Sequence, residues 1–248
     1  MSALPTLVLA HGAFSKASLY DSFAAQVEKH GMQVVTPQLP SSSPSPPAEP
    51  FAADVAVIHH ALQNQLAAGD VVLLTHSYGG IPACEALKNL QKSKGRVRAI
   101  IFVSAFVADE GQNLITSKAH GHADWVRRGE GGLCYVNDPA VTLFSGISDH
   151  ATVNAAVGGT CAQAGAALMA KATEATWKQY PCFYVKCLED NANEVREQDH
   201  FIDRLRNGGA LAGVEELSSC HYPFVSMPED LAEMVKSITH SLATSASA

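Results

Sequence analysis

The chain has 248 residues, of which 47% are hydrophobic and 17% charged, a composition that predicts one sizeable folded domain. Its formal net charge is −7, without long runs of either sign, so no basic patch is available for nucleic acid or a membrane surface. No apolar run approaches the roughly 18 residues that span a bilayer, and we expect a soluble, cytoplasmic protein that binds a small, largely apolar substrate.

The first part of the chain alternates short apolar runs with amphipathic segments. Such apolar runs are typical of strands buried on both faces, and they predict strands over residues 6–10, 33–39, 71–75 and 99–103. Apolar residues at helical spacing predict helices over residues 19–27, 51–66 and 81–87, with a Ser/Pro-rich surface loop over residues 40–50. This alternation predicts an α/β fold with a mostly parallel, twisted sheet and helices on both faces.

Residues 107–177 break this alternation. They are rich in Gly, Ala and His, contain helical fragments such as residues 162–175, and show no strand of the buried type. The segment is too long for an ordinary connection, so we expect an inserted helical cap over the sheet edge. Strands over residues 183–188 and 214–217, helices over 194–207 and 231–242, and a frayed tail over 243–248 complete the prediction. The core then comprises residues 1–106 and 178–248.

The third predicted strand leads directly into the stretch His-Ser-Tyr-Gly-Gly at residues 76–80. This stretch resembles a nucleophile elbow, in which Ser77 would occupy a sharp turn between strand and helix. Gly79 and Gly80 suit such a turn because its backbone segments approach closely. Thr75 stands where a glycine is usual, and the pattern by itself also fits a plain turn without catalysis.

Polar residues follow four of the predicted strands: His11, Ser77, Asp190 and His221. In open parallel sheets, ligands bind beyond the carboxyl ends of the strands. Each residue alone fits an ordinary turn or structural role, but Ser, Asp and His in this chain order are typical of a catalytic triad. Ser77 is the candidate nucleophile, His221 the base and Asp190 the acid that orients it. Glu189 is the alternative acid, since adjacent strand residues face opposite sides.

These motifs, together with His11-Gly12-Ala13, resemble those of the α/β-hydrolase superfamily from the first strand to the last helix. Within it, the chain resembles the plant methylesterase and hydroxynitrile lyase group and its microbial relatives, which implies small esters or related acyl compounds as substrates. The chain departs from the pattern at Thr75, at residues 191–194 and at Tyr222. Hydroxynitrile lyases carry a lysine at the place of Tyr222 and a threonine at that of Gly12, so the chain resembles the esterases.

An oxyanion hole would use the backbone N–H of Tyr78 and a second N–H from the loop after the first strand, with Ala13 the first candidate and Phe14 the second. Several residues near strand ends or in the cap are candidates for an apolar substrate pocket, with ordinary packing as the alternative for each. They are Gly12, Phe14, Phe106, Trp125 and Tyr222.

No cofactor or metal is expected. The six cysteines are scattered without a Cys-x-x-Cys motif, which favours reduced, mostly buried thiols over a zinc site. His120 and His122 resemble a metal pair, but two histidines separated by one residue are more often solvated, and that is the stronger interpretation. Glycine-rich nucleotide-binding motifs are absent from the sequence. The oligomeric state stays open, with a homodimer as one option.

The sequence therefore predicts a serine hydrolase, specifically a carboxylic ester hydrolase that cleaves a small, largely apolar ester or lactone through an acyl-enzyme. One alternative is a biosynthetic lyase, cyclase or carbon–carbon bond hydrolase that uses the same pocket with His221 as the general base. The other alternative is a small-molecule receptor of the same fold.

Overall fold

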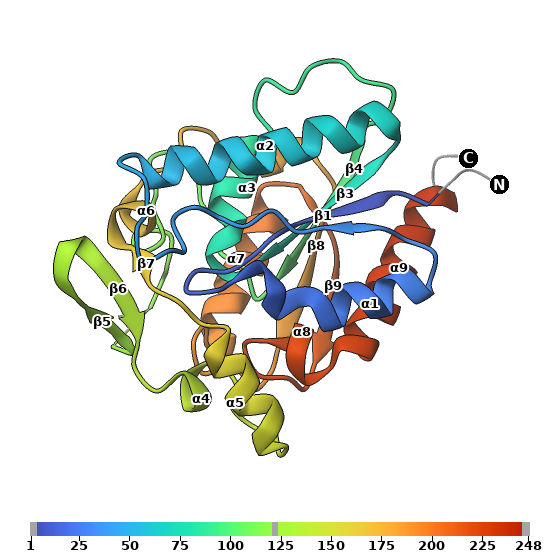
Figure 1. Cartoon of the computed structure of the whole chain (residues 1–248). Helices are drawn as coiled ribbons and strands as arrows, with labels where there is room; N and C mark the ends of the chain where they lie inside the picture. Colours follow the sequence, from blue (N-terminus) through green and yellow to red (C-terminus); the bar gives the residue numbers. More distant parts are fainter. Residues whose placement is uncertain (1–3, 121–123, 245–248) are drawn as a thin grey trace.

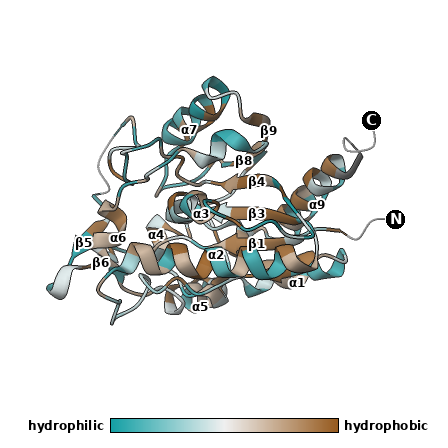
Figure 2. Cartoon of the chain, turned by 90° about the horizontal axis from the view of Figure 1, so that it is seen from above, coloured by the Kyte–Doolittle hydropathy of each residue, from teal (hydrophilic) through white to brown (hydrophobic). Residues whose placement is uncertain are grey.

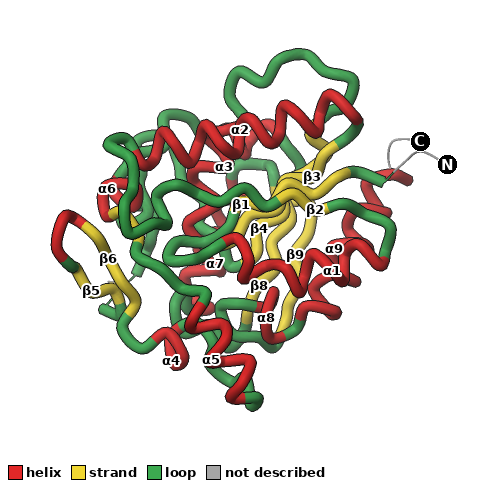
Figure 3. Tube along the Cα trace, viewed as in Figure 1, coloured by secondary structure: helices red, strands yellow, loops and turns green. Residues whose placement is uncertain are grey.

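The computed structural model describes residues 4–120 and 124–244, and its centre is a sheet of six parallel strands in the order β2-β1-β3-β4-β8-β9. These strands are β1 (Thr6–Ala10), β2 (Val34–Val35), β3 (Val71–His76), β4 (Val97–Val103), β8 (Cys182–Cys187) and β9 (Leu211–Leu217). The helices around them are α1 (Asp21–Lys29), α2 (Pro50–Ala68), α3 (Gly80–Ala86), α7 (Val195–Asn207), α8 (Pro223–Ser226) and α9 (Pro228–Thr244). Helices cover both faces of the sheet, which confirms the predicted α/β architecture (Figures 1 and 3).

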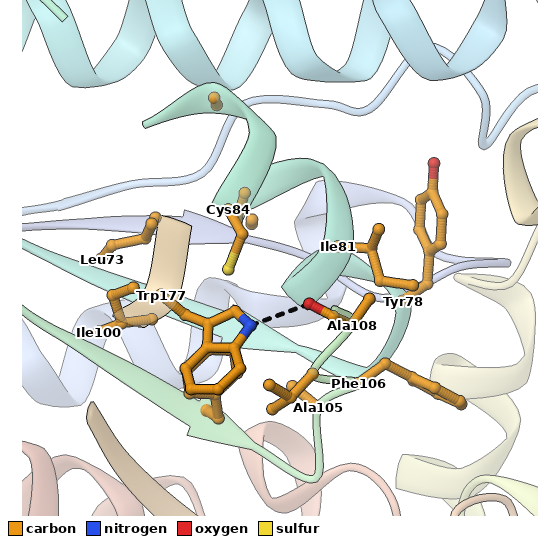
Figure 4. Packing of buried hydrophobic residues seen from close by; sticks show 14 of the residues in the cluster. Leu73, Tyr78, Ile81, Cys84, Ile100, Ala105, Phe106, Ala108 and Trp177 are labelled. Carbon is orange, nitrogen blue, oxygen red and sulfur yellow. Dashed lines mark hydrogen bonds between the residues drawn. The ribbon is translucent and has the colours of Figure 1, made fainter. Parts of the chain in front are cut away.

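Each face of the sheet has its own apolar core. Strand residues alternate between the two: Leu73 packs in the cluster beneath α2, α3 and α7, whereas Leu74 packs in the cluster beneath α1 and α9. The central strands β1, β3 and β4 are mainly hydrophobic, as expected when both faces are covered (Figure 2). In the first cluster, Cys84 and Ile81 of α3 lie over Leu73, Ile100 and neighbouring strand residues (Figure 4).

The second strand is shorter than predicted. The sequence indicated residues 33–39, but only Val34–Val35 pair with β1. This strand lies at the edge of the sheet, and Pro37 has no N–H to donate to a ladder. The chain then turns away, and the Leu39 N–H donates instead to His11 Nε2 over 2.9 Å.

Residues 107–177, which we call the insert, lie between β4 and β8 and contain a small sheet as well as helices. Its elements are β5 (Val126–Arg128), β6 (Leu133–Val136), α4 (Pro139–Thr142), α5 (His150–Gly158), β7 (Gln163–Ala164) and α6 (Gly165–Met169). The antiparallel sheet β5-β6-β7 was not predicted, and the helix expected over residues 162–175 is reduced to α6. The two ends of the insert are joined, because Trp177 Nε1 donates to the Ala108 carbonyl over 2.9 Å (Figure 4).

Two sequence expectations involve residues outside the described part of the chain. His122 of the proposed histidine pair is one, and residues 245–248 of the expected frayed tail are the other. None of the helices that the structure describes has both the length and the apolar character needed to cross a membrane.

Candidate active site

The strand order places two loops side by side where a ligand site is expected. From β1 the chain first goes to β2 on one side and then to β3 on the other, so β1 and β3 flank a topological switch point. Ala10 pairs with Thr75 at the carboxyl ends of these strands. The loop that begins at His11 therefore lies beside the turn that carries Ser77.

Ser77 occupies a strained turn. Its φ is 51°, in the left-handed region that non-glycine residues rarely adopt. A Cβ on Gly79 would lie 2.3 Å from the Ala10 carbonyl oxygen, and one on Gly80 would lie 2.2 Å from that of Phe106. Glycine is therefore required at both positions for the turn to approach its neighbours. Thr75 precedes the turn as a fully buried strand residue, and its hydroxyl donates to the Ile101 carbonyl of β4 over 3.4 Å.

Asp190 and His221 form a buried hydrogen-bonded pair, with 2.7 Å between Asp190 Oδ2 and His221 Nδ1. The same oxygen accepts from Ser104 Oγ at 2.5 Å, and the other accepts from the Ala192 and Asn193 N–H groups at 2.8 Å each. Four donors thus hold the carboxyl group in one orientation. The alternative acid, Glu189, is exposed. The geometry favours Asp190.

His76 holds the loop that carries His221. Three strand spacings, roughly 14 Å, separate β9 from β3, so this loop must run back across the sheet edge. His76 Nε2 donates to the His221 carbonyl over 2.8 Å, and its Nδ1 accepts from the Tyr20 hydroxyl over 2.6 Å. Burial, followed by the nearby His221, holds the pKa of His76 well below its usual range, so this imidazole stays neutral.

His11 orients the loop after β1. Its Nδ1–H donates to the Gly12 carbonyl over 2.8 Å, while its Nε2 accepts from Leu39. The Gly12 carbonyl and the Ala13 N–H belong to one planar peptide unit, so this bond also sets the direction of the Ala13 N–H. Burial lowers the pKa of His11 to about 4, which keeps the tautomer that this arrangement needs.

The same loop is attached to the insert. The Phe14 N–H donates to Gln163 Oε1 over 3.3 Å, and the Phe14 carbonyl accepts from the Cys161 N–H over 2.8 Å. The Phe14 N–H is therefore already engaged. Among the described residues, the Ala13 N–H has no acceptor, which favours Ala13 over Phe14 as an oxyanion donor.

A cavity of about 590 Å³ opens above the turn and is bounded by both the core and the insert. The predicted site residues that line it are Ala13, Phe14, Ser77, Tyr78, Phe106, Trp125 and His221. Most of its remaining wall is apolar and comes from the insert. Ser77 and His221 thus face one space, although no hydrogen bond joins their side chains within the described residues. Such bonds often tighten only when substrate binds.

Two residues predicted as substrate contacts, Gly12 and Tyr222, are not among the described residues that line this cavity. The Tyr222 ring is buried against His76, with 4.6 Å between ring centroids, and its hydroxyl is hydrogen-bonded to Ser15. A Cβ on Gly12 would lie 2.9 Å from His76 Nδ1 and 3.1 Å from Ser77 Cβ. Both residues therefore pack against His76, beneath the cavity wall.

The sequence analysis missed several supporting residues. Ser104 directly follows β4 and could have been found as a fifth polar residue at a strand end. Asp54 on α2 gave no such signal: its buried carboxyl group accepts from the Tyr78 hydroxyl over 2.7 Å and from Ser41 Oγ over 2.5 Å. Burial raises the pKa of Asp54. The Tyr78 ring accordingly points toward α2 (Figure 4).

Comparison with known proteins gives one family for nearly the whole chain. The family model described as "Alpha/beta hydrolase family" matches residues 7–234. "Probable hydrolase R7" of Phoma sp. is 29% identical over 238 residues, covering 93% of this chain and 96% of that protein. The crystal structure of polyneuridine aldehyde esterase has a TM-score of 0.79 at 18% identity, covering 95% and 99% of the two chains. Tomato methylketone synthase I, in a variant bound to β-ketoheptanoate, has a TM-score of 0.77 at 14% identity, covering 97% and 100%.

Proposed function

This chain belongs to the alpha/beta hydrolase family, and from that membership we propose that it is a serine esterase acting on a small, largely apolar carboxylic ester or lactone. The predictions of a hydrolase and of an enzyme are confirmed at the level of the family. The finer proposal rests on one observation: Ser77 and the Asp190-bound His221 line the buried end of a single, mostly apolar cavity.

The proposed mechanism assigns one role to each group. His221 takes the proton of Ser77 Oγ, which attacks the ester carbonyl to form a tetrahedral intermediate. The Ala13 and Tyr78 N–H groups bind its oxyanion, each such donor contributing about 3 to 4 kcal/mol. His221 then protonates the leaving alcohol, and water releases the acid from the acyl-enzyme by the same steps. Asp190 holds the imidazole and stabilises its charged form.

The cavity also supports the proposed division of the chain into a core (residues 1–106 and 178–248) and a cap (residues 107–177). Its floor, with Ser77 and His221, comes from the core, and much of its wall, including Trp125, comes from the insert. A cap of this kind excludes water and selects the substrate.

A second reaction type remains a candidate because no hydrogen bond joins Ser77 to His221 within the described structure. In this alternative, His221 removes a proton from the substrate directly and no acyl-serine forms, as in a lyase, cyclase or carbon–carbon bond hydrolase. The cavity and the Asp190–His221 pair serve both reactions equally.

Covalent trapping separates these reactions. Wild-type protein, Ser77→Ala and Ser45→Ala are treated with a fluorophosphonate and analysed by mass spectrometry, alongside hydrolysis of short p-nitrophenyl esters. Ser45 is exposed in the loop before α2 and serves as the matched serine control. We expect one adduct and repeated turnover in wild type and Ser45→Ala, and neither in Ser77→Ala.

Other results point elsewhere. An adduct on Ser77 without ester turnover would favour the direct-base reaction or a receptor. Absence of any adduct in the wild type would show that Ser77 is not activated, and the esterase proposal would be wrong.

A further inference from the structure

The cavity carries a charge pattern that ester cleavage alone does not use. The chain has 24 acidic and 17 basic residues, yet both of the fully charged side chains on the cavity wall, Lys118 and Arg128, are cationic. Among the residues that the structure describes, no carboxylate lines the cavity. Within the part of the chain that the structure describes, neither cation has an ion-pair partner. Two cations without a carboxylate beside them give the cavity wall a positive charge, which suits an anionic ligand.

The two cations lie away from the reacting groups. Ser77 and His221 are 9% and 3% exposed and form the buried end of the cavity, whereas Lys118 is partly exposed and Arg128 exposed at its rim. Apolar side chains, among them those of Phe106 and Leu168, line the same cavity. A molecule that fills the cavity therefore meets both the buried Ser77 and His221 and the more exposed cations.

Lys118 has a fixed backbone although it lies in a loop. The Ser117 carbonyl before it accepts from Arg204 Nη2 over 2.9 Å. The Ala119 N–H after it donates to Glu197 Oε2 over 3.1 Å, and Glu197 is only 2% exposed. Both anchoring side chains come from α7, so the position of Lys118 is set by the core.

Arg128 is directed to the cavity by strand geometry. It pairs with Cys134, which also lines the cavity, in the ladder between β5 and β6. Its neighbour Arg127 points to the other face, where its guanidinium lies 4.7 Å from the centre of the Tyr135 ring. Arg127 thus offers a matched control: the same residue type on the same strand, outside the cavity.

We propose that the natural substrate is an ester or lactone whose apolar body ends in a carboxylate, bound by Lys118 and Arg128. This inference rests on the proposed function, since it describes the substrate of the same site. The carboxylate takes no part in bond making. It pairs with the cations at the rim and so directs the ester carbonyl toward Ser77.

The test compares two substrates of equal length: the mono-p-nitrophenyl ester of a linear dicarboxylic acid, and the same compound with its free carboxyl group methylated. The readout is the ratio of kcat/KM for the anionic ester to that for the neutral ester. At the solvent-exposed rim each cation is expected to contribute about three- to tenfold to this ratio. Lys118→Gln and Arg128→Gln should each lower it accordingly, mainly through KM, and added salt should lower it in the wild type.

Controls and a binding measurement keep this test separate from that of the esterase function. Arg127→Gln should leave the ratio unchanged, and Lys118→Arg should restore most of it. Binding of both esters to Ser77→Ala, measured by calorimetry, needs no turnover: preference for the anionic ester without turnover in the wild type would refute only the esterase function. Equal binding of the two esters, or equal losses on both in the glutamine variants, would overturn the carboxylate proposal.

Discussion

Ser104 illustrates how one residue can support the reacting groups without touching substrate. It has a φ of 41° and donates to the same Asp190 oxygen that accepts from His221. Its carbonyl in turn accepts from the Asn193 side chain over 3.0 Å. Asp190, the proposed acid, is therefore held by the residue that follows β4 as well as by its own loop, so we expect Ser104 to act as a positioning residue.

We expect Ser104→Ala to lower kcat of the proposed esterase roughly tenfold, because a hydrogen bond to a charged group contributes about 1.5 to 3 kcal/mol. The pH dependence of kcat/KM should also change, since this bond affects the charge balance of the Asp190–His221 pair. The control Thr239→Val removes a buried hydroxyl on α9 and should change neither kcat nor the pH dependence of kcat/KM. An unchanged pH profile in Ser104→Ala would leave Ser104 only a packing role.

His11 makes stability depend on pH. Its pKa is about 4 in the folded protein against 6.5 when unperturbed, so folding favours the neutral ring. The resulting stabilisation is complete above the unfolded pKa and is lost as the pH falls through the folded value. The loss over this interval is about 3 kcal/mol. Urea unfolding of the wild type and His11→Gln should show that the difference between their free energies of unfolding shrinks by this amount as the pH is lowered from 6.5 to 4. A constant difference would contradict it.

At the scale of elements, the contact between the end of β1 and the start of α3 determines whether the turn at Ser77 can form. We expect Gly79→Ala to destabilise the protein by about 3 kcal/mol or more, because its Cβ would meet the Ala10 and His11 carbonyl oxygens at 2.3 and 2.6 Å. A Cβ on Gly158, in α5, would have no neighbouring atom within 4 Å, so Gly158→Ala should be neutral or slightly stabilising. Urea unfolding followed by circular dichroism measures both. Similar stability of the two variants would be inconsistent with this packing.

Sequence patterns predicted the elements to different degrees. The buried runs of β1, β3 and β4 were recognisable because a strand covered on both faces is continuously apolar. The β5–β6 hairpin was missed because β5 has only three residues and ends in two arginines. The turn residues Gly131 and Gly132, both with positive φ, were the available signal.

The candidate site was predictable only where chain order carries information. Ser77, Asp190 and His221 follow strands whose order in space can be inferred, so their convergence could be expected. The roles of His76 and Gln163 could not, because each depends on contacts between segments far apart in the sequence. Such contacts are set by tertiary packing, which leaves no local pattern.

At the scale of the whole molecule, stability comes from the two apolar cores and not from cross-links. All six cysteines are free, and five of them are buried. Burial raises the pKa of Cys161 to about 11 and that of Cys182 to about 12, so few thiolates exist near neutral pH.

We therefore expect labelling of the native protein by Ellman's reagent to be at least about a hundredfold slower than that of a small thiol. Cys161, the least buried, should react first, and Cys161→Ser should remove that phase. Unfolding should expose six thiols without added reductant. A count of four would instead indicate a disulfide, and rapid native labelling would show that the cores open readily.

The attachment of the loop after β1 to Cys161 and Gln163 also bears on enzyme engineering. Transplanting a complete insert from a relative would exchange the partners of Phe14 as well as the cavity wall. Chimeras in which residues 107–177 are exchanged should then hydrolyse even simple p-nitrophenyl esters more slowly. Recombination that retains the host's residues 159–163 would vary the cavity wall while preserving the loop that carries the proposed oxyanion donor.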